Sequence, residues 1–186
     1  MGGWFNKKID SLKDLEGLKM RIPGLGGEVL NRLGGTAVSL PGGEIFTSLK
    51  SGAIDATEWV GPYNDLAFGL HKAAKYYYYP GWHEPGTTLE CFINKEEFDA
   101  LPKDLQTIVL SASKVANLDG LSELTARNNA ALNTLVNKHG VQLKKFPDEV
   151  LKQLRKVSDE VVAEVAKNDP MSKKVYDSYI KFREEA

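Results

Sequence analysis

The chain has almost no cysteine, no long apolar run and almost no net charge. Its one cysteine, Cys91, excludes an intrachain disulfide and a zinc cluster built from cysteines. No run of about 18 apolar residues occurs, so no membrane-spanning helix is predicted. The formal net charge is −1 and no basic block is present, which disfavours nucleic acid as a partner. The N-terminal sequence MGGWFNKKID also lacks the basic start and apolar stretch of an export signal.

What remains is the composition of an ordinary globular protein, with 42% hydrophobic and 26% charged residues in a chain of 186. This length suits one domain or two small lobes. The first hundred residues alternate short apolar runs with helical patterns, which is typical of an α/β protein. The patterns predict strands at 18–22, 36–40, 54–58, 75–79 and 87–94, and helices at 27–33, at 43–50 and from Pro62 onward. Cys91 alternates with polar neighbours, so it is expected in the core on the last of these strands.

After Pro102 the pattern becomes helical. Residues 103–138 contain no proline and carry apolar residues at steps of three and four, which predicts one helix roughly 50 Å long. Gly120 is a candidate bend, and Gly140 ends the helix. A short strand is then expected at 141–146, followed by two amphipathic helices separated by Asp169-Pro170.

Arg21 is the first candidate binding residue. It ends an apolar strand pattern just before Pro23-Gly24, and its guanidinium offers a planar fork of donors that matches a carboxylate. The alternative is an arginine that pairs with a surface acid. Gly24, Gly26 and Gly27 do not complete a dinucleotide-binding motif, and a helix N-terminus that helps to receive an anion fits them better.

Glu58, Trp59 and Glu84 are candidate metal ligands. Glu58 and Trp59 end a predicted strand, where α/β proteins place ligand groups, and Glu84 lies at a turn beyond the next helix and strand. Two carboxylates and the Trp59 backbone carbonyl would suit sodium or calcium. The alternatives are a core tryptophan with two solvated glutamates, or a small metal-dependent lyase acting on oxo acids. The three histidines show no zinc-ligand spacing.

Three separated motifs carry a family resemblance. They are GWFNKKIDSLKDLEGLKMRIPGLGGEVLNRLGG, LPGGEIFTSLKSGAIDATEWVGPYNDLAFGL and YYYPGWHEPGTTLECFINKEEFDALP. Together they resemble the solute-binding proteins of TRAP transporters, the DctP-like family, and most closely the branch that binds 2-oxo acids and hydroxy acids with a metal ion. The resemblance covers nearly the whole chain.

The resemblance implies an α/β fold of the periplasmic binding protein type II kind, in an incomplete form. We expect the second lobe plus part of the first lobe, a long connecting helix and C-terminal helices. Residues 1–57 would belong to one ligand-binding lobe, 58–101 to crossover strands and a helix of the other lobe, and 102–186 to the long helix and the C-terminal helices. Family members are about twice this length, so the chain is expected to be the C-terminal half of such a receptor.

The resemblance also implies a site and a role. Arg21 would bind the ligand carboxylate, Glu58, Trp59 and Glu84 would contact both ligand and metal, and the matching motif adds Tyr63 and Asn64 as substrate-binding residues. The expected metal is sodium or calcium. The expected role is that of a periplasmic receptor without catalytic activity, which delivers a small organic acid to the membrane permease of a sodium-driven TRAP transporter. A folded fragment that binds nothing is the further alternative, and pairing with a second copy of the chain is expected.

Overall fold

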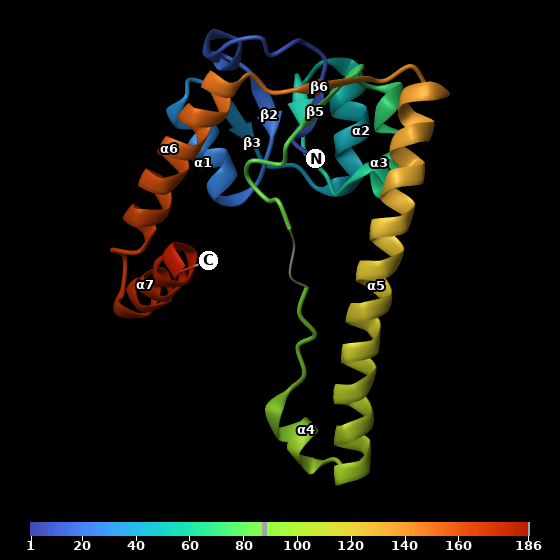
Figure 1. The fold of residues 1–186 in the computed structure, drawn as a ribbon, viewed down its shortest axis with the longest axis vertical. Coiled ribbons are helices and arrows are strands. Elements are labelled where there is room, and N and C mark those ends of the chain that lie inside the picture. The colour runs from blue at the N-terminus through green and yellow to red at the C-terminus, as the bar shows by residue number, and fades with distance from the viewer. Residues whose placement is uncertain (87–88, 186) are drawn as a thin grey trace.

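A single six-stranded sheet organises the computed structural model, which describes residues 1–86 and 89–185 (Figure 1). The strands are β1 (Gly3–Phe5), β2 (Lys19–Arg21), β3 (Thr36–Val38), β4 (Ala56–Thr57), β5 (Tyr76–Tyr79) and β6 (Gln142–Lys145). Their order is β3-β2-β4-β1-β5-β6. Only β1 runs antiparallel to its neighbours β4 and β5, and the other pairs are parallel. The α/β class is therefore confirmed, and β1 is a strand that the sequence analysis did not predict.

The helices largely follow the sequence patterns. They are α1 (Gly24–Arg32), α2 (Gly42–Ser51), α3 (Pro62–Phe68), α4 (Lys95–Ala100), α5 (Lys103–Asn137), α6 (Asp148–Val165) and α7 (Pro170–Glu185), with 3-10 turns η1 (Leu12–Leu15) and η2 (Leu70–Lys72). Pro62 opens α3, where its missing N–H is no loss. The helix α5 is continuous through Gly120 and projects far beyond the sheet, with α4 at its distal end (Figure 1). None of the helices among the described residues has the length and apolar character needed to cross a membrane.

Two apolar cores cover the two faces of the sheet. One contains Phe5 and Tyr78 with side chains of α1 and α6, and the other contains Trp4 and Tyr77 with side chains of α2 and the end of α5. Successive residues of a strand point to opposite faces, so β1 and β5 each supply one large aromatic side chain to each core. This explains the run of tyrosines in β5, whose two central members are both buried.

The glycines of α1 are required for close packing. A Cβ atom on Gly27 would lie 2.7 Å from the Ile22 carbonyl oxygen and 3.0 Å from the Ala37 Cβ. A Cβ on Gly26 would lie 3.3 Å from the Cβ of His83. Gly26 and Gly27 therefore let α1 pack closely against the sheet and the loop after β5, and the anion-binding role suggested by the sequence stays a prediction.

We expect Gly27→Ala to destabilise the protein by about 1–3 kcal/mol, because the new methyl group meets backbone that cannot move aside. Gly120→Ala is the matched control, since a Cβ at this helical glycine meets nothing within 4 Å. There the substitution should stabilise by up to about 1 kcal/mol, through helix propensity alone. Urea unfolding of both variants measures the two free energies. Equal effects at the two positions would contradict the packing argument.

The predicted strand at 87–94 is wrong over residues 89–94, which are the described part of this segment. Residues 87 and 88 lie outside the described residues, and 89–94 form no strand. Leu89 and Phe92 are 89% and 87% exposed, and Cys91 is exposed rather than buried in the core. The alternating pattern meets no neighbouring strand here, so its side chains have no sheet face to cover.

One sheet draws strands from all three segments proposed from the sequence. β1 to β4 lie within 1–57, β5 lies within 58–101, and β6 lies within 102–186. The assignment of these segments to the lobes of a longer receptor stays a prediction. Apolar side chains are exposed along α5 and α7, including Ile108, Leu118, Leu121, Met171, Val175 and Phe182.

Candidate functional site

The candidate site lies at the carboxyl ends of the strands β2, β4 and β5. Arg21 is the last residue of β2, Glu58 directly follows β4, and His83 and Glu84 lie in the loop after β5. These three strands run in the same direction, because β2 is parallel to β4 and β1 is antiparallel to both β4 and β5. Groups that follow parallel strands meet at one edge, which is where open α/β sheets bind ligands.

Arg21 and Glu58 form a largely buried ion pair. The Arg21 Nη1 group donates to Glu58 Oε1, and the two side chains are only 14% and 5% exposed. The backbone supports the pair, because the Glu58 N–H donates to the Arg21 carbonyl at 3.2 Å. Arg21 Nε also donates to the carbonyl of Leu40 at 3.3 Å. These bonds use two of the five guanidinium N–H groups, and the contact of Arg21 with a ligand carboxylate stays a prediction.

Trp59 forms a wall beside this pair. The Arg21 guanidinium carbon lies 5.7 Å from the centroid of the Trp59 ring, within cation–π range. The indole stacks on Phe68, with ring centroids 5.1 Å apart and an interplanar angle of 16°. Its far edge reaches Gly42 at the start of α2, where an added Cβ would lie 2.9 Å from Cη2. Trp59 is therefore held in place on both sides, and it fixes the plane against which Arg21 lies.

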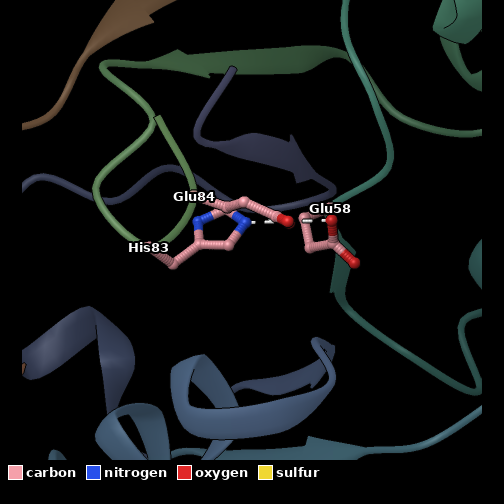
Figure 2. A group of neighbouring side chains, drawn as sticks. All are labelled: Glu58, His83 and Glu84. Carbon is pink, nitrogen blue, oxygen red and sulfur yellow. Dashed lines mark ion pairs between the residues drawn. The ribbon is translucent and has the colours of Figure 1, made fainter. Parts of the chain in front are cut away.

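Three side chains come close enough to hold one metal ion. Glu58, His83 and Glu84 each offer a ligand atom, and these atoms lie within 4.8 Å of one another (Figure 2). Two oxygens on opposite sides of a calcium ion stand about 4.6–5.2 Å apart, because Ca–O distances are 2.3–2.6 Å. The spacing therefore fits a hard cation. Two carboxylates supply the charge that such an ion prefers.

His83 is the member of this group that sequence reasoning missed. Its Nε2 atom lies 3.8 Å from Glu58 Oε2, an ion pair when the imidazole is protonated (Figure 2). Its Nδ1 atom is buried and has no hydrogen-bond partner among the described residues. The sequence places His83 directly before Glu84, but the direction of its ring depends on how the loop after β5 packs against Gly26 of α1.

Tyr63 and Asn64 lie in the first turn of α3. The Tyr63 N–H donates to Asn128 Oδ1 at 2.9 Å, and the Arg127 guanidinium carbon lies 5.2 Å from the Tyr63 ring centroid. Both partners belong to α5. Within the described part of the chain, no hydrogen bond or ion pair joins Tyr63 or Asn64 to Arg21 or Glu58. Their contact with a ligand, like the metal contact of the Trp59 carbonyl, stays a prediction.

Comparison with known proteins identifies the family. Residues 1–169 match the model of the DctP family, described as bacterial extracellular solute-binding protein, family 7. The chain belongs to this family. A curated relative, a monocarboxylate 2-oxoacid-binding periplasmic protein from Nostoc sp., is 48% identical over 185 residues, which are 100% of this chain and 50% of that protein. The chain thus spans about half the length of this relative.

Solved structures of TRAP periplasmic solute-binding proteins share the fold. A protein from Colwellia psychrerythraea, with bound calcium and pyruvate, has a TM-score of 0.93 and 44% identity, over 100% of this chain and 56% of that chain. One from Pseudoalteromonas atlantica, with bound sodium and pyruvate, has a TM-score of 0.91 and 44% identity, over the same shares of the two chains. One from Bordetella bronchiseptica is a dimer with calcium and picolinate, with a TM-score of 0.93 and 39% identity, over 100% of this chain and 55% of that chain. The predicted DctP resemblance and the periplasmic binding protein fold are confirmed.

Proposed function

We propose that this chain forms one wall of a periplasmic receptor site that binds a small 2-oxo acid together with a sodium or calcium ion. The observation that carries the proposal is the convergence of Arg21, Glu58 and the His83-Glu84 pair at one edge of the sheet. The guanidinium that would bind the carboxylate of the ligand then lies next to the oxygen atoms that would coordinate the metal. The relatives that hold pyruvate with calcium or sodium support the choice of ligand.

The Arg21–Glu58 pair explains why acid and metal would bind together. A cation held by Glu58 lies close to the positive guanidinium, so the two like charges repel each other. A carboxylate placed between them would accept hydrogen bonds from Arg21 and would also coordinate the cation. Each ligand therefore raises the affinity of the site for the other, and such coupling is reciprocal.

The proposed role is transport rather than catalysis. Among the described site residues, carboxylates, an imidazole and a guanidinium are present, but no activated serine, cysteine or lysine lies beside a base. The partners that we propose are the organic acid, the permease subunits of a TRAP transporter, and a second copy of the chain. The exposed apolar residues of α5 and α7 support the last of these.

A chimera tests the proposal, with this chain replacing the matching 185 residues of the Nostoc relative. Calorimetric titration with pyruvate, in the presence of sodium or calcium, should show saturable binding that disappears when the cations are removed by chelation and exchange for a bulky organic cation. A folded chimera that binds no 2-oxo acid would refute the receptor assignment. Binding that survives complete removal of the metal would refute the cation site alone.

We expect Glu84→Gln in this chimera to weaken binding of both the cation and the acid by about tenfold each. The reason is that the substitution removes one carboxylate charge from the metal, and the coupling passes the loss to the acid. Glu96→Gln is the matched control, since Glu96 is an exposed glutamate in α4 outside the cluster. Titrations of calcium at fixed pyruvate, and of pyruvate at fixed calcium, measure the two affinities. Loss of acid binding without loss of cation binding would contradict the bridged arrangement.

A further inference from the structure

A cavity lies at the amino ends of the parallel strands, away from the candidate site. It has a volume of about 350 Å³, and its lining includes Lys50, His71, Lys72 and Lys75. Tyr76, also in the lining, is the first residue of β5 and pairs with Phe5 at the end of β1. This register places the cavity at the amino ends of the parallel strands, whereas Arg21 and Glu58 lie at their carboxyl ends. The cavity is therefore separate from the proposed receptor site.

The cavity lining carries three lysines. None of Lys50, Lys72 and Lys75 forms an ion pair among the residues described. The Lys50 ammonium instead donates to the backbone carbonyl of Lys72, another lining residue, at 2.8 Å.

Asp55 is an acidic residue next to a residue that lines this cavity. Its backbone carbonyl accepts a hydrogen bond from the N–H of Asn6, another lining residue. Its carboxylate is already engaged, because it pairs with Lys7 at 3.1 Å and accepts the N–H of Lys19 at 3.0 Å. Asp55 therefore leaves the three cavity lysines without a counter-ion.

His71 adds an unsatisfied buried group to the same cavity. Both of its ring nitrogens are buried and have no hydrogen-bond partner among the described residues. Its ring lies against His139, with centroids 4.1 Å apart. Burial lowers the pKa of His71, and His139 and Lys72 lower it further. A buried ring N–H without an acceptor is rare in folded proteins, and this ring belongs to a residue of the cavity lining.

We propose that this cavity binds a small oxyanion of the phosphate class, carrying two negative charges, between the three lysines and His71. Ammonium groups act as point charges that can surround a tetrahedral anion, whereas a planar monocarboxylate is matched better by a guanidinium fork. The volume is at the lower end of the range for small-molecule sites, which suits inorganic phosphate or a small phosphate ester. An anion there neutralises the lysines and lies next to His71, a residue of the same lining.

The test is a titration of the 186-residue chain with inorganic phosphate, followed by calorimetry. We expect saturable binding, weakened at least about tenfold in the double variant Lys72→Gln/Lys75→Gln, through loss of two charge-assisted contacts. Lys114→Gln is the matched control, since Lys114 is an exposed lysine on α5, and it should leave the affinity unchanged. Phosphate should also shift the ring resonances of His71 in an NMR spectrum. A parallel titration with glycerol phosphate distinguishes an ester from the free ion as the preferred form.

Three outcomes would overturn the proposal. They are the absence of saturation at millimolar phosphate, an affinity that falls equally in the Lys114→Gln control, and displacement of phosphate by pyruvate. The last result would place the phosphate at Arg21 instead. Because the two sites lie at opposite ends of the parallel strands, the double lysine variant should leave pyruvate binding by the chimera unchanged. Failure of the phosphate site is thus distinguishable from failure of the receptor site.

Discussion

Arg21→Lys is expected to lower the affinity of the receptor chimera for 2-oxo acids by one to two orders of magnitude. The guanidinium makes two contacts that one ammonium cannot reproduce with the same geometry: Nη1 donates to Glu58 and Nε donates to the carbonyl of Leu40. These contacts hold the guanidinium in a fixed orientation beside Glu58. Loss of one charge-assisted hydrogen bond in a buried site is worth about 1.5–3 kcal/mol.

Arg32→Lys is the matched control for this substitution. Arg32 also pairs with carboxylates, those of Glu28 and Glu164, but it lies on the surface of α1. Its replacement should leave pyruvate affinity unchanged and cost little stability, because exposed ion pairs contribute about 0–1 kcal/mol. Calorimetry on the three proteins at fixed calcium gives the comparison. If Arg21→Lys binds every 2-oxo acid as tightly as the parent chimera, Arg21 does not contact the ligand.

The positions of the candidate site residues near strand ends could be predicted from the sequence, because the signals that mark the end of a strand are local. Arg21 and Glu58 each follow a short apolar run, so their position at a strand end could be inferred without knowing the neighbouring strands. Glu84 was inferred in the same way from its place after the tyrosine run. The parallel arrangement of the three strands then brings these groups together, as the structure shows.

The features that were missed depend on contacts between distant parts of the chain. β1 is three residues long and is a strand only because β4 and β5 flank it on both sides. The segment 89–94 shows the opposite case, because its alternating pattern has no partner strand and its apolar side chains stay exposed. His83 joins the site through the packing of its loop against Gly26. None of these three features can be predicted from a short stretch of about ten residues, because each depends on contacts with distant parts of the chain.

The loop that carries Glu58 and Trp59 depends on a buried carboxylate in α3. Asp65 is fully buried and accepts four hydrogen bonds. Its Oδ2 atom accepts from the Trp4 indole N–H and from the Tyr77 hydroxyl, each at 2.9 Å. Its Oδ1 atom accepts from the backbone N–H groups of Val60 at 3.2 Å and Gly61 at 3.0 Å. Asp65 therefore ties the residues just after Trp59 to β1 and β5.

Burial and hydrogen bonding act in opposite directions on the pKa of Asp65. Burial raises the pKa of the Asp65 carboxyl, and the hydrogen bonds from Trp4, Tyr77 and the two backbone amides oppose this rise. Burial and the neighbouring Asp65 raise the pKa of Tyr77, so its hydroxyl remains a donor. An indole N–H and two amide N–H groups can only donate. The indole and the two backbone amides therefore need an oxygen acceptor on each side of the Asp65 carboxyl group.

We therefore expect Asp65→Asn to destabilise the protein by about 3 kcal/mol. If the NH2 group of the asparagine took the position of Oδ2, it would meet the indole N–H of Trp4. If it took the position of Oδ1, it would meet the backbone N–H groups of Val60 and Gly61. In either orientation at least one buried donor loses its acceptor, which costs about 1–3 kcal/mol beyond the lost charge-assisted bonds. Urea unfolding measures the change. Asp119→Asn, at an exposed position of α5, is the control and should fall within about 0.5 kcal/mol of the parent.

A second measurement separates loop positioning from general stability. With the loop after β4 no longer held by Asp65, pyruvate affinity of the chimera should fall even at temperatures where the variant is fully folded, since Glu58 and Trp59 lose their fixed geometry. Val161→Ala gives the comparison, because it destabilises the same domain by removing buried methyl groups from α6, outside this hydrogen-bond network. If both variants bind pyruvate as tightly as the parent when folded, Asp65 stabilises the fold but does not position the site. A loss confined to Asp65→Asn would make this buried aspartate the anchor of the ligand-binding loop.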